Sequence, residues 1–117
     1  MKKLWHISVY ALAVMGILHV VFTPFYYHRL NVDAIWFISC GFLLIFQAFI
    51  NILAWQMQKK SGYLIAMISN FISLLLILAL MWILWEIQDY IGVFLALAVF
   101  SGSSYFRKKA WTLQVQE

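Results

Sequence analysis

The sequence predicts an all-α integral membrane protein, a four-helix antiparallel bundle with both termini on the cytoplasmic side. Three observations lead to this prediction. Apolar residues make up 66% of the 117 residues and charged residues only 10%, whereas soluble domains average about 45–50% and about 25%. The apolar residues form four runs that are each long enough to cross a bilayer. The basic residues gather on one side of these runs.

The composition also excludes several classes of protein. A soluble domain of this size buries about two-thirds of the surface that its unfolded chain exposes. The apolar excess therefore requires a bilayer, which excludes a soluble enzyme, a nucleic-acid-binding domain and a disordered segment. The four runs occupy nearly the whole length, so we expect a single transmembrane domain over residues 1–117. A β-barrel is excluded because the runs lack period-two alternation and the chain is too short for eight strands.

The first predicted span covers residues 4–22. Lys2 and Lys3 precede it, as in a signal peptide, but the apolar run continues past the A-x-A pattern that would mark cleavage. We therefore expect an uncleaved first helix. Pro24 is the sole proline and should end this helix or bend its tip, because proline lacks the backbone N–H that a helix interior needs.

The second predicted span covers residues 34–55, and Asn31 or Asp33 can cap its start, where an acid also suits the helix dipole. A short basic turn separates it from the third predicted span, residues 63–85. A short acidic turn leads to the fourth, residues 91–106. This span is the shortest, so we expect it to cross the bilayer with little tilt.

The charges predict the orientation of the bundle. Seven of the eight basic residues fall on the side that holds both termini, namely Lys2, Lys3, Lys59, Lys60, Arg107, Lys108 and Lys109. Three acids, Asp33, Glu86 and Asp89, fall on the opposite side with Arg29. The positive-inside rule makes the basic side cytoplasmic. These cations need no nucleic-acid partner, because anionic lipid headgroups also attract them.

A layer of polar side chains crosses the spans toward their cytoplasmic ends. Counting about 1.5 Å per helical residue from each end places Ser8, Asn51 and Asn70 at similar depth, with Gln47 nearer the middle. Helices in a bilayer associate through small residues and polar contacts. We interpret the layer as hydrogen bonding between helices. The alternative is a binding site for a polar ligand.

The opposite end carries the predicted ligand-binding set, which is His19, Thr23, Tyr27, His28, Asp33, Trp36 and Glu86. An ionisable group within a span is a functional hypothesis by default, and an aromatic wall with a few polar groups is typical of small-molecule sites. Two alternatives stay open. The imidazole of His19 can simply bond a neighbouring carbonyl or hydroxyl, and the remaining residues can form an interfacial belt with solvated charges.

The sequence predicts no catalytic residue, no metal and no cofactor. His19 and His28 are about 13 Å apart along a helix, so they cannot both ligate one haem iron. His28, Asp33, Glu86 and Asp89 are suitable metal ligands in type but have no motif spacing. There is no nucleophile motif of the G-x-S-x-G kind. The first span also lacks the glutamate on which small multidrug-resistance transporters depend.

One stretch carries a family resemblance. The run His19-Val-Val-Phe-Thr23-Pro24-Phe25-Tyr26-Tyr27, followed by Asp33-Ala34-Ile35-Trp36-Phe37 and by Gly41 and Asn51, resembles a group of small uncharacterised bacterial four-span membrane proteins. The resemblance covers about the first half of the chain. It implies the four-helix fold and a bacterial cytoplasmic membrane, and it implies no activity.

Two hypotheses for function follow from these patterns. The first is a non-enzymatic membrane protein that binds a lipophilic or amphipathic small molecule, or a lipid, in an outward-facing pocket. The alternative is an accessory or structural subunit that docks on a larger membrane protein complex, and a small transporter ranks third. The expected partners are membrane lipids, a lipophilic ligand, and further copies of this chain or a larger membrane complex, with no nucleic acid.

Overall fold

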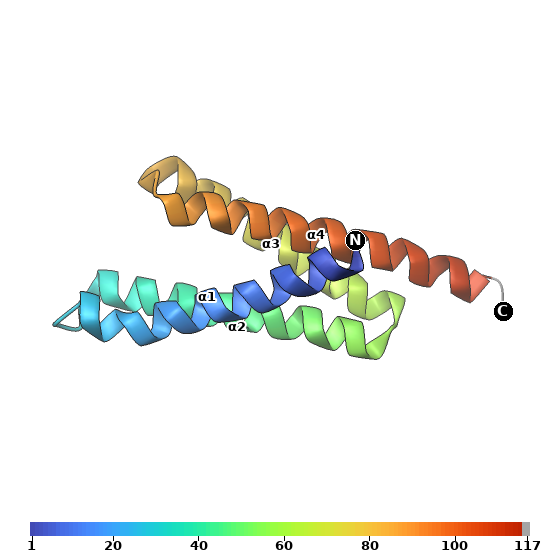
Figure 1. Ribbon diagram of the computed structural model, residues 1–117, viewed down its shortest axis with the longest axis horizontal. Coiled ribbons are helices and arrows are strands. Elements are labelled where there is room, and N and C mark those ends of the chain that lie inside the picture. Colours follow the sequence, from blue (N-terminus) through green and yellow to red (C-terminus); the bar gives the residue numbers. More distant parts are fainter. Residues whose placement is uncertain (116–117) are drawn as a thin grey trace.

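The computed structural model describes the backbone of residues 1–115 and the side chains of residues 1–112. This part of the chain forms four helices: α1 (Lys2–Tyr26), α2 (Val32–Met57), α3 (Lys60–Leu84) and α4 (Ile87–Val115). All four are long and apolar enough to cross a membrane. Successive helices run in opposite directions (Figure 1). The predicted all-α antiparallel bundle with four candidate membrane spans is therefore confirmed.

Helices α1, α2 and α4 extend beyond the predicted apolar runs at both ends, and α3 begins three residues earlier than its run and ends one residue before its end. Helical hydrogen bonding continues where hydrophobicity stops. Pro24 stands in the last turn of α1, which ends two residues later at Tyr26. Of the two predicted caps of α2, Asn31 takes the role, since its side-chain oxygen accepts from the Ala34 backbone N–H at 2.8 Å. The helix α4 has 29 residues and is the longest of the four rather than the shortest. It continues past its apolar run into the basic segment 107–109.

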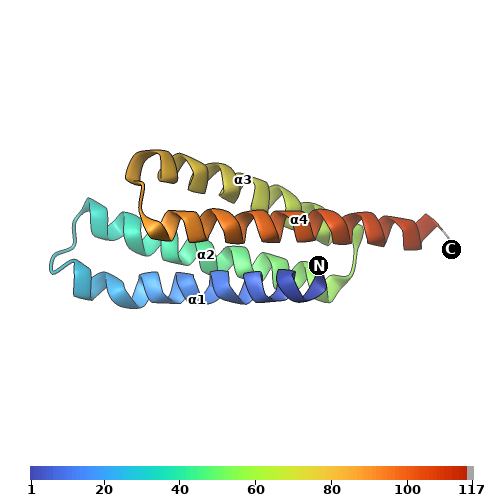
Figure 2. The same ribbon diagram turned by 45° about the horizontal axis from the view of Figure 1, so that its top comes forward.

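The four helices are arranged as two hairpins, α1–α2 and α3–α4, as Figures 1 and 2 show. The hairpins meet near the N-terminus and the α2–α3 turn, and they diverge toward the α1–α2 loop and the α3–α4 turn. We call the first end the basic end, because it carries Lys2, Lys3, Lys59, Lys60, Arg107, Lys108 and Lys109. We call the second the acidic end, because it carries Asp33, Glu86 and Asp89.

The first hairpin is held by a close contact between two glycines. A Cβ atom placed on Gly41 would lie 2.8 Å from the carbonyl oxygen of Gly16. A Cβ atom on Gly16 would lie 2.6 Å from the carbonyl oxygen of Gly41. The two backbones therefore touch directly, as small residues allow when the solvent offers no hydrophobic driving force between helices.

An aromatic cluster fills the basic end, where the two hairpins meet. Trp5 is 1% exposed and Tyr63 is 2% exposed. The Trp5 ring lies 5.5 Å from the rings of both Trp55 and Phe106. Gly102 makes room for the Trp5 indole, since a Cβ atom at that position would overlap with it. Large rings from all four helices thus close this end of the bundle.

The acidic end has no such closure. The last buried residue of α3 is Leu74, and each residue of this helix from 75 to 84 is at least partly exposed. In the part of α3 nearest the acidic end, Ile77 packs beside Gly92 of α4, the other helix of the same hairpin. The bundle is therefore tightly packed from the basic end to about its middle and open beyond that point.

The glycine contact predicts an unequal response to the same small substitution. We expect Gly41→Ala to destabilise the protein by about 1–3 kcal/mol, the usual cost of overpacking, because its Cβ atom meets backbone at 2.8 Å. Gly92→Ala is the matched control, since its Cβ atom would meet only the Ile77 side chain at 3.5 Å. Thermal unfolding midpoints in a mild detergent measure both variants. Equal midpoints for the two would contradict the close α1–α2 contact.

Candidate functional site

A hydrogen-bonded network of amides and serines lies in the middle of the bundle. Asn70 of α3 is 1% exposed and Asn51 of α2 is fully buried. Their side chains form a reciprocal pair, in which each Nδ2 donates to the other Oδ1 at 2.9 Å. Asn70 Nδ2 also donates to the Ser103 hydroxyl of α4 at 2.9 Å. This one asparagine therefore connects three helices.

Gln47 extends the network toward the acidic end. Its Nε2 donates to Asn70 Oδ1, and its Oε1 accepts from the hydroxyls of Ser69 at 2.7 Å and Ser73 at 3.1 Å. Asn51 Nδ2 additionally donates to the Gln47 carbonyl oxygen at 2.8 Å. Every side-chain amide nitrogen and oxygen in the network has a partner. This arrangement supports the interpretation of the layer as interhelical hydrogen bonding.

Two serines differ from the sequence-based expectation. Ser8 is buried, and its hydroxyl donates to the Leu4 carbonyl oxygen of its own helix at 2.8 Å. No amide of the network donates to it, so it stays outside. Ser103 belongs to the network and was missed. The sequence does place Ser103 one helical turn after Val99, so the two residues share a helix face, and both are buried. The fourth helix therefore contributes a hydroxyl to the network.

A small cavity lies directly above the network on the side of the acidic end. It is lined by Leu12, Leu44, Gln47, Asn70, Ser73, Ile77, Ala96 and Val99. Its volume is about 10 Å³, close to the least space that holds one water molecule. Polar groups of the network form its floor, and apolar side chains from all four helices form its walls.

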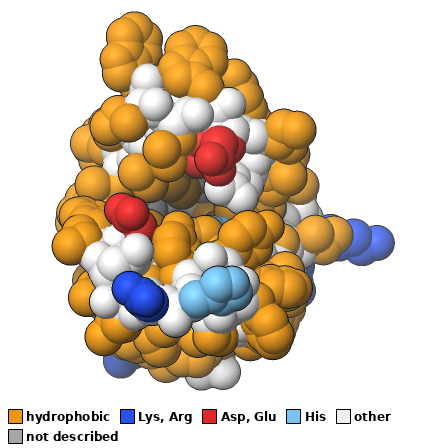
Figure 3. All heavy atoms as spheres, turned by 90° about the vertical axis from the view of Figure 1, so that its left-hand side faces the viewer, with side chains coloured by type: hydrophobic (Ala, Val, Ile, Leu, Met, Phe, Trp, Pro, Cys, Tyr) orange, Lys and Arg blue, Asp and Glu red, His pale blue; other side chains and the backbone are white. Residues whose placement is uncertain are grey.

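Residues one heptad farther along two of these helices lie where the two hairpins diverge (Figure 1). His19 follows Leu12 by seven residues, and Gly92 precedes Val99 by seven, so each pair shares one helix face. Figure 3 looks at the acidic end and shows a hollow between the two hairpins, with acidic side chains near its rim. We call this hollow the cleft, and the small cavity lies on the side of the amide network that faces it.

His19 lies in this part of the bundle with one ring nitrogen engaged and one free. Its Nδ1 lies 2.8 Å from the Met15 carbonyl oxygen, and its ring stacks on Phe37 at 4.6 Å between centroids. A carbonyl oxygen only accepts, so in the neutral ring Nδ1 carries the hydrogen and Nε2 carries the lone pair. Within the described residues nothing donates to Nε2, and the side chain is half-buried. His19 therefore presents an acceptor that the protein itself does not use.

Thr23 and Tyr27 follow His19 along the chain, Thr23 in the last turns of α1 and Tyr27 as the residue that caps its C-terminal end. The Thr23 hydroxyl donates to the His19 carbonyl oxygen at 2.6 Å, and Thr23 is 7% exposed. The Tyr27 ring lies 5.8 Å from that of Phe37. The rings of His19 and Tyr27 thus both lie near Phe37 at the contact between α1 and α2, and Thr23 bonds the backbone between them.

The other four members lie at the rim of the acidic end. His28, Asp33, Trp36 and Glu86 are all exposed, and Trp36 keeps 66% of its surface accessible. The Glu86 carboxylate accepts from Gln88 Nε2 on the second hairpin. No hydrogen bond within the described chain joins these four to His19. The predicted set therefore divides into an inner group of three residues and an outer group of four.

No group of three or more His, Cys, Asp or Glu side chains comes together to hold a metal ion among residues 1–115. Cys40 is half-buried in α2 and unpaired within this range. No protein-family model, no curated protein and no solved structure matches the chain. The geometry of the bundle is therefore what supports a functional proposal.

The network predicts a large effect for one asparagine and a small effect for a neighbouring serine. Asn70→Leu removes the partners of Asn51, Gln47 and Ser103 together. We expect it to destabilise the protein by about 2 kcal/mol, in the range for orphaned buried polar groups. Ser73→Ala removes one of two donors to Gln47 Oε1, and about 0.6 kcal/mol is typical of a single interhelical bond. Unfolding midpoints in detergent test the ranking, and a Ser73→Ala effect as large as that of Asn70→Leu would contradict it.

Proposed function

We propose that this protein binds an amphipathic molecule, a lipid or a lipophilic small molecule, in the cleft between its two hairpins at the acidic end. The observation that carries the proposal is the unused acceptor of His19 beside a gap that the hairpins leave open. A hydroxyl or amine of the ligand donates to His19 Nε2. The apolar part of the ligand lies between the hairpins, where its contact replaces the packing that the basic end has and the acidic end lacks.

The lining of the cleft matches such a molecule. Toward the middle of the bundle, the small cavity has apolar walls and the amide network as its floor. In this proposal a ligand therefore enters from the acidic end or from the lipid between the hairpins. The rim carries the four exposed members of the predicted set, His28, Asp33, Trp36 and Glu86. An apolar interior with a few polar groups that fix orientation is the usual make-up of a small-ligand site.

Monoolein is a suitable probe, because it has an apolar chain and hydroxyl donors. We expect native mass spectrometry of the detergent-purified protein to detect a monoolein adduct, and His19→Leu to reduce its occupancy about fivefold to tenfold. One lost hydrogen bond of about 1 kcal/mol, with the cost of leaving the hydroxyl unpaired, accounts for that reduction. Trp36→Ala should have a smaller effect, since this ring lies at the rim.

His6 provides a matched control within the same helix. Its Nδ1 lies 2.8 Å from the Lys2 carbonyl oxygen, four residues earlier, and its ring lies 4.6 Å from that of Trp55. His6→Leu therefore removes the same kind of local bond at the basic end and should leave monoolein occupancy unchanged. Equal occupancy in the His19→Leu variant and the wild type would refute the site. A stoichiometric partner chain without any monoolein adduct would favour the docking subunit instead.

We also infer that the basic end faces the cytoplasm of a bacterial cell, so that the cleft opens on the outer side of the cytoplasmic membrane. The support is the charge distribution, because short loops rich in lysine and arginine are retained in the cytoplasm. The α2–α3 turn carries Lys59 and Lys60, whereas the α3–α4 turn carries Glu86 and Asp89. The resemblance to bacterial four-span proteins points to the same membrane.

Cysteine labelling tests this orientation. In a Cys40→Ala background, Glu86→Cys should react with a membrane-impermeant maleimide in intact cells. Lys59→Cys should react only after the membrane is permeabilised. Both side chains are exposed, so neither is shielded by the protein itself. The reverse labelling pattern would show that the acidic end faces the cytoplasm.

A further inference from the structure

A separate groove lies at the basic end between α3 and α4. Its volume is about 560 Å³, and it is lined by Lys60, Met67, Ser104, Arg107, Lys108 and Trp111. The four lining residues of α4 follow one another at steps of three, one and three, so they share the helix face that borders α3. Three of the six lining side chains are cations and none is acidic.

The chain supplies no described counter-ion to this groove. Of its four acidic residues, Asp33, Glu86 and Asp89 lie at the acidic end, and Glu117 lies outside the described residues. The helix α3 also begins at the groove and has no acidic residue in its first turn. The partial positive charge of a helix N-terminus therefore adds to the three cationic side chains.

Arg107 is the cation that most clearly lacks a partner of matching chemistry. It is half-buried, and its Nη1 donates to Met67 Sδ at 3.7 Å. A thioether is a weak acceptor, whereas a guanidinium has five N–H donors. The contact with Met67 places the Arg107 guanidinium in the groove between α4 and α3.

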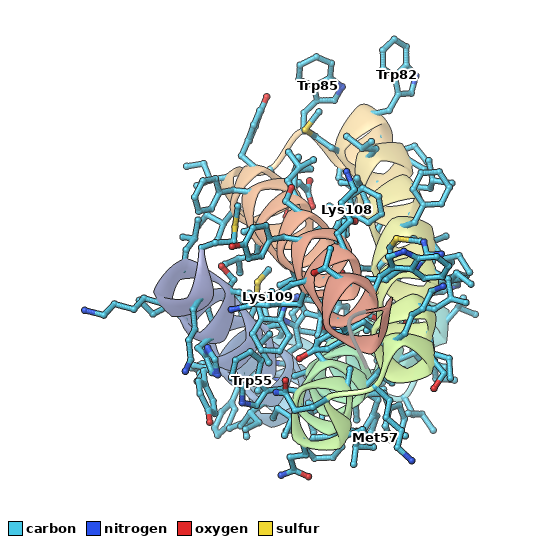
Figure 4. All side chains as sticks on the ribbon, turned by 90° about the vertical axis from the view of Figure 1, so that its right-hand side faces the viewer. Trp55, Met57, Trp82, Trp85, Lys108 and Lys109 are labelled. Carbon is cyan, nitrogen blue, oxygen red and sulfur yellow. The ribbon has the colours of Figure 1, made fainter. Side chains whose placement is uncertain are left out.

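The other cations surround the same space. The Lys60 ammonium lies 3.1 Å from the centroid of the Trp111 ring, which places it over an exposed aromatic face. Figure 4 shows Lys108 on the side of α4 that borders α3, and Lys109 on the side that borders α1. Consecutive residues thus project in different directions, and Lys109 does not line the groove.

We propose that this groove binds the headgroup of an anionic phospholipid. Its phosphate is held by the planar fork of Arg107, which matches a phosphate bidentately, and by the ammonium groups of Lys60 and Lys108. The apolar surfaces of Met67 and Trp111 contact the glycerol and the first acyl carbons. A free phosphate ion has no apolar part that could contact Met67 and Trp111, so the groove should favour the phospholipid. This site lies at the opposite end from the proposed ligand cleft and is independent of it.

Native mass spectrometry of delipidated protein tests the proposal, with phosphatidylglycerol and phosphatidylcholine of identical acyl chains added at equal concentration. We expect phosphatidylglycerol to be retained preferentially. Arg107→Gln or Lys108→Gln should each reduce its retention about fivefold, and the double variant about 25-fold, from about 1 kcal/mol for each basic residue near a membrane surface. Arg107→Lys should fall between the wild type and Arg107→Gln, because it keeps the charge and loses the fork.

Lys109→Gln is the matched control, because it removes the same charge from the adjacent position outside the groove. Its retention of phosphatidylglycerol should stay within twofold of the wild type. An equal loss of retention in Lys109→Gln and Lys108→Gln would show that only the total positive charge matters, which would overturn the proposal. Equal retention of the two lipids would also overturn it, as would displacement of phosphatidylglycerol by millimolar inorganic phosphate. Arg107→Lys, which preserves net charge, keeps the test decisive if the double variant does not fold.

Discussion

The hydrogen-bonded pair of Asn51 and Asn70 is the interaction on which the arrangement of this bundle depends. Apolar surface gives helices in a bilayer little reason to choose one neighbour over another, because lipid tails are as apolar as leucine. Directional bonds between amides make that choice. Asn70 joins α3 to α2 through Asn51 and to α4 through Ser103. The register of the second hairpin against the first is therefore fixed at the depth of these side chains.

The two halves of the molecule follow from the position of that network. Between the network and the basic end, Trp5 and Tyr63 close the bundle with aromatic packing, and both rings are almost completely buried. Toward the acidic end the two hairpins diverge (Figure 1), while α1 and α2 stay in backbone contact at Gly16 and Gly41. The network joins the two hairpins in the middle and the aromatic cluster joins them at the basic end, so they separate only at the acidic end. This division leaves His19 beside a gap with an acceptor that no described protein group uses.

The two proposed sites use the two ends of the molecule in different ways. The cleft at the acidic end offers apolar walls and one hydrogen-bond acceptor, so it suits a molecule with few charges. The groove at the basic end offers three cations on a partly apolar surface, so it suits an anion that is attached to acyl chains. In both proposals the ligand comes from the membrane.

Much of this protein is determined by the sequence alone. The number of helices, their approximate positions and the separation of charges follow from hydrophobicity and the location of lysine and arginine, because a bilayer requires about 20 apolar residues for each span. The depth of Asn51, Asn70 and Gln47 was also predictable, since depth depends only on the count of residues from a helix end. The resulting amide layer is present and has the interhelical role that was expected of it.

Only the tertiary structure decided which faces meet. The sequence placed Ser8 in the polar layer by depth. Both serines bond a carbonyl of their own helix, but only Ser103 also faces Asn70 and joins the network. The residues of the predicted ligand-binding set likewise all lie toward the acidic end. In the fold, one group lies at the contact between α1 and α2, and the other lies exposed at the rim of that end. Depth is a property of one helix and can be counted along the chain. Facing depends on how each helix is rotated against its neighbours, and that rotation is fixed by contacts between residues far apart in the sequence.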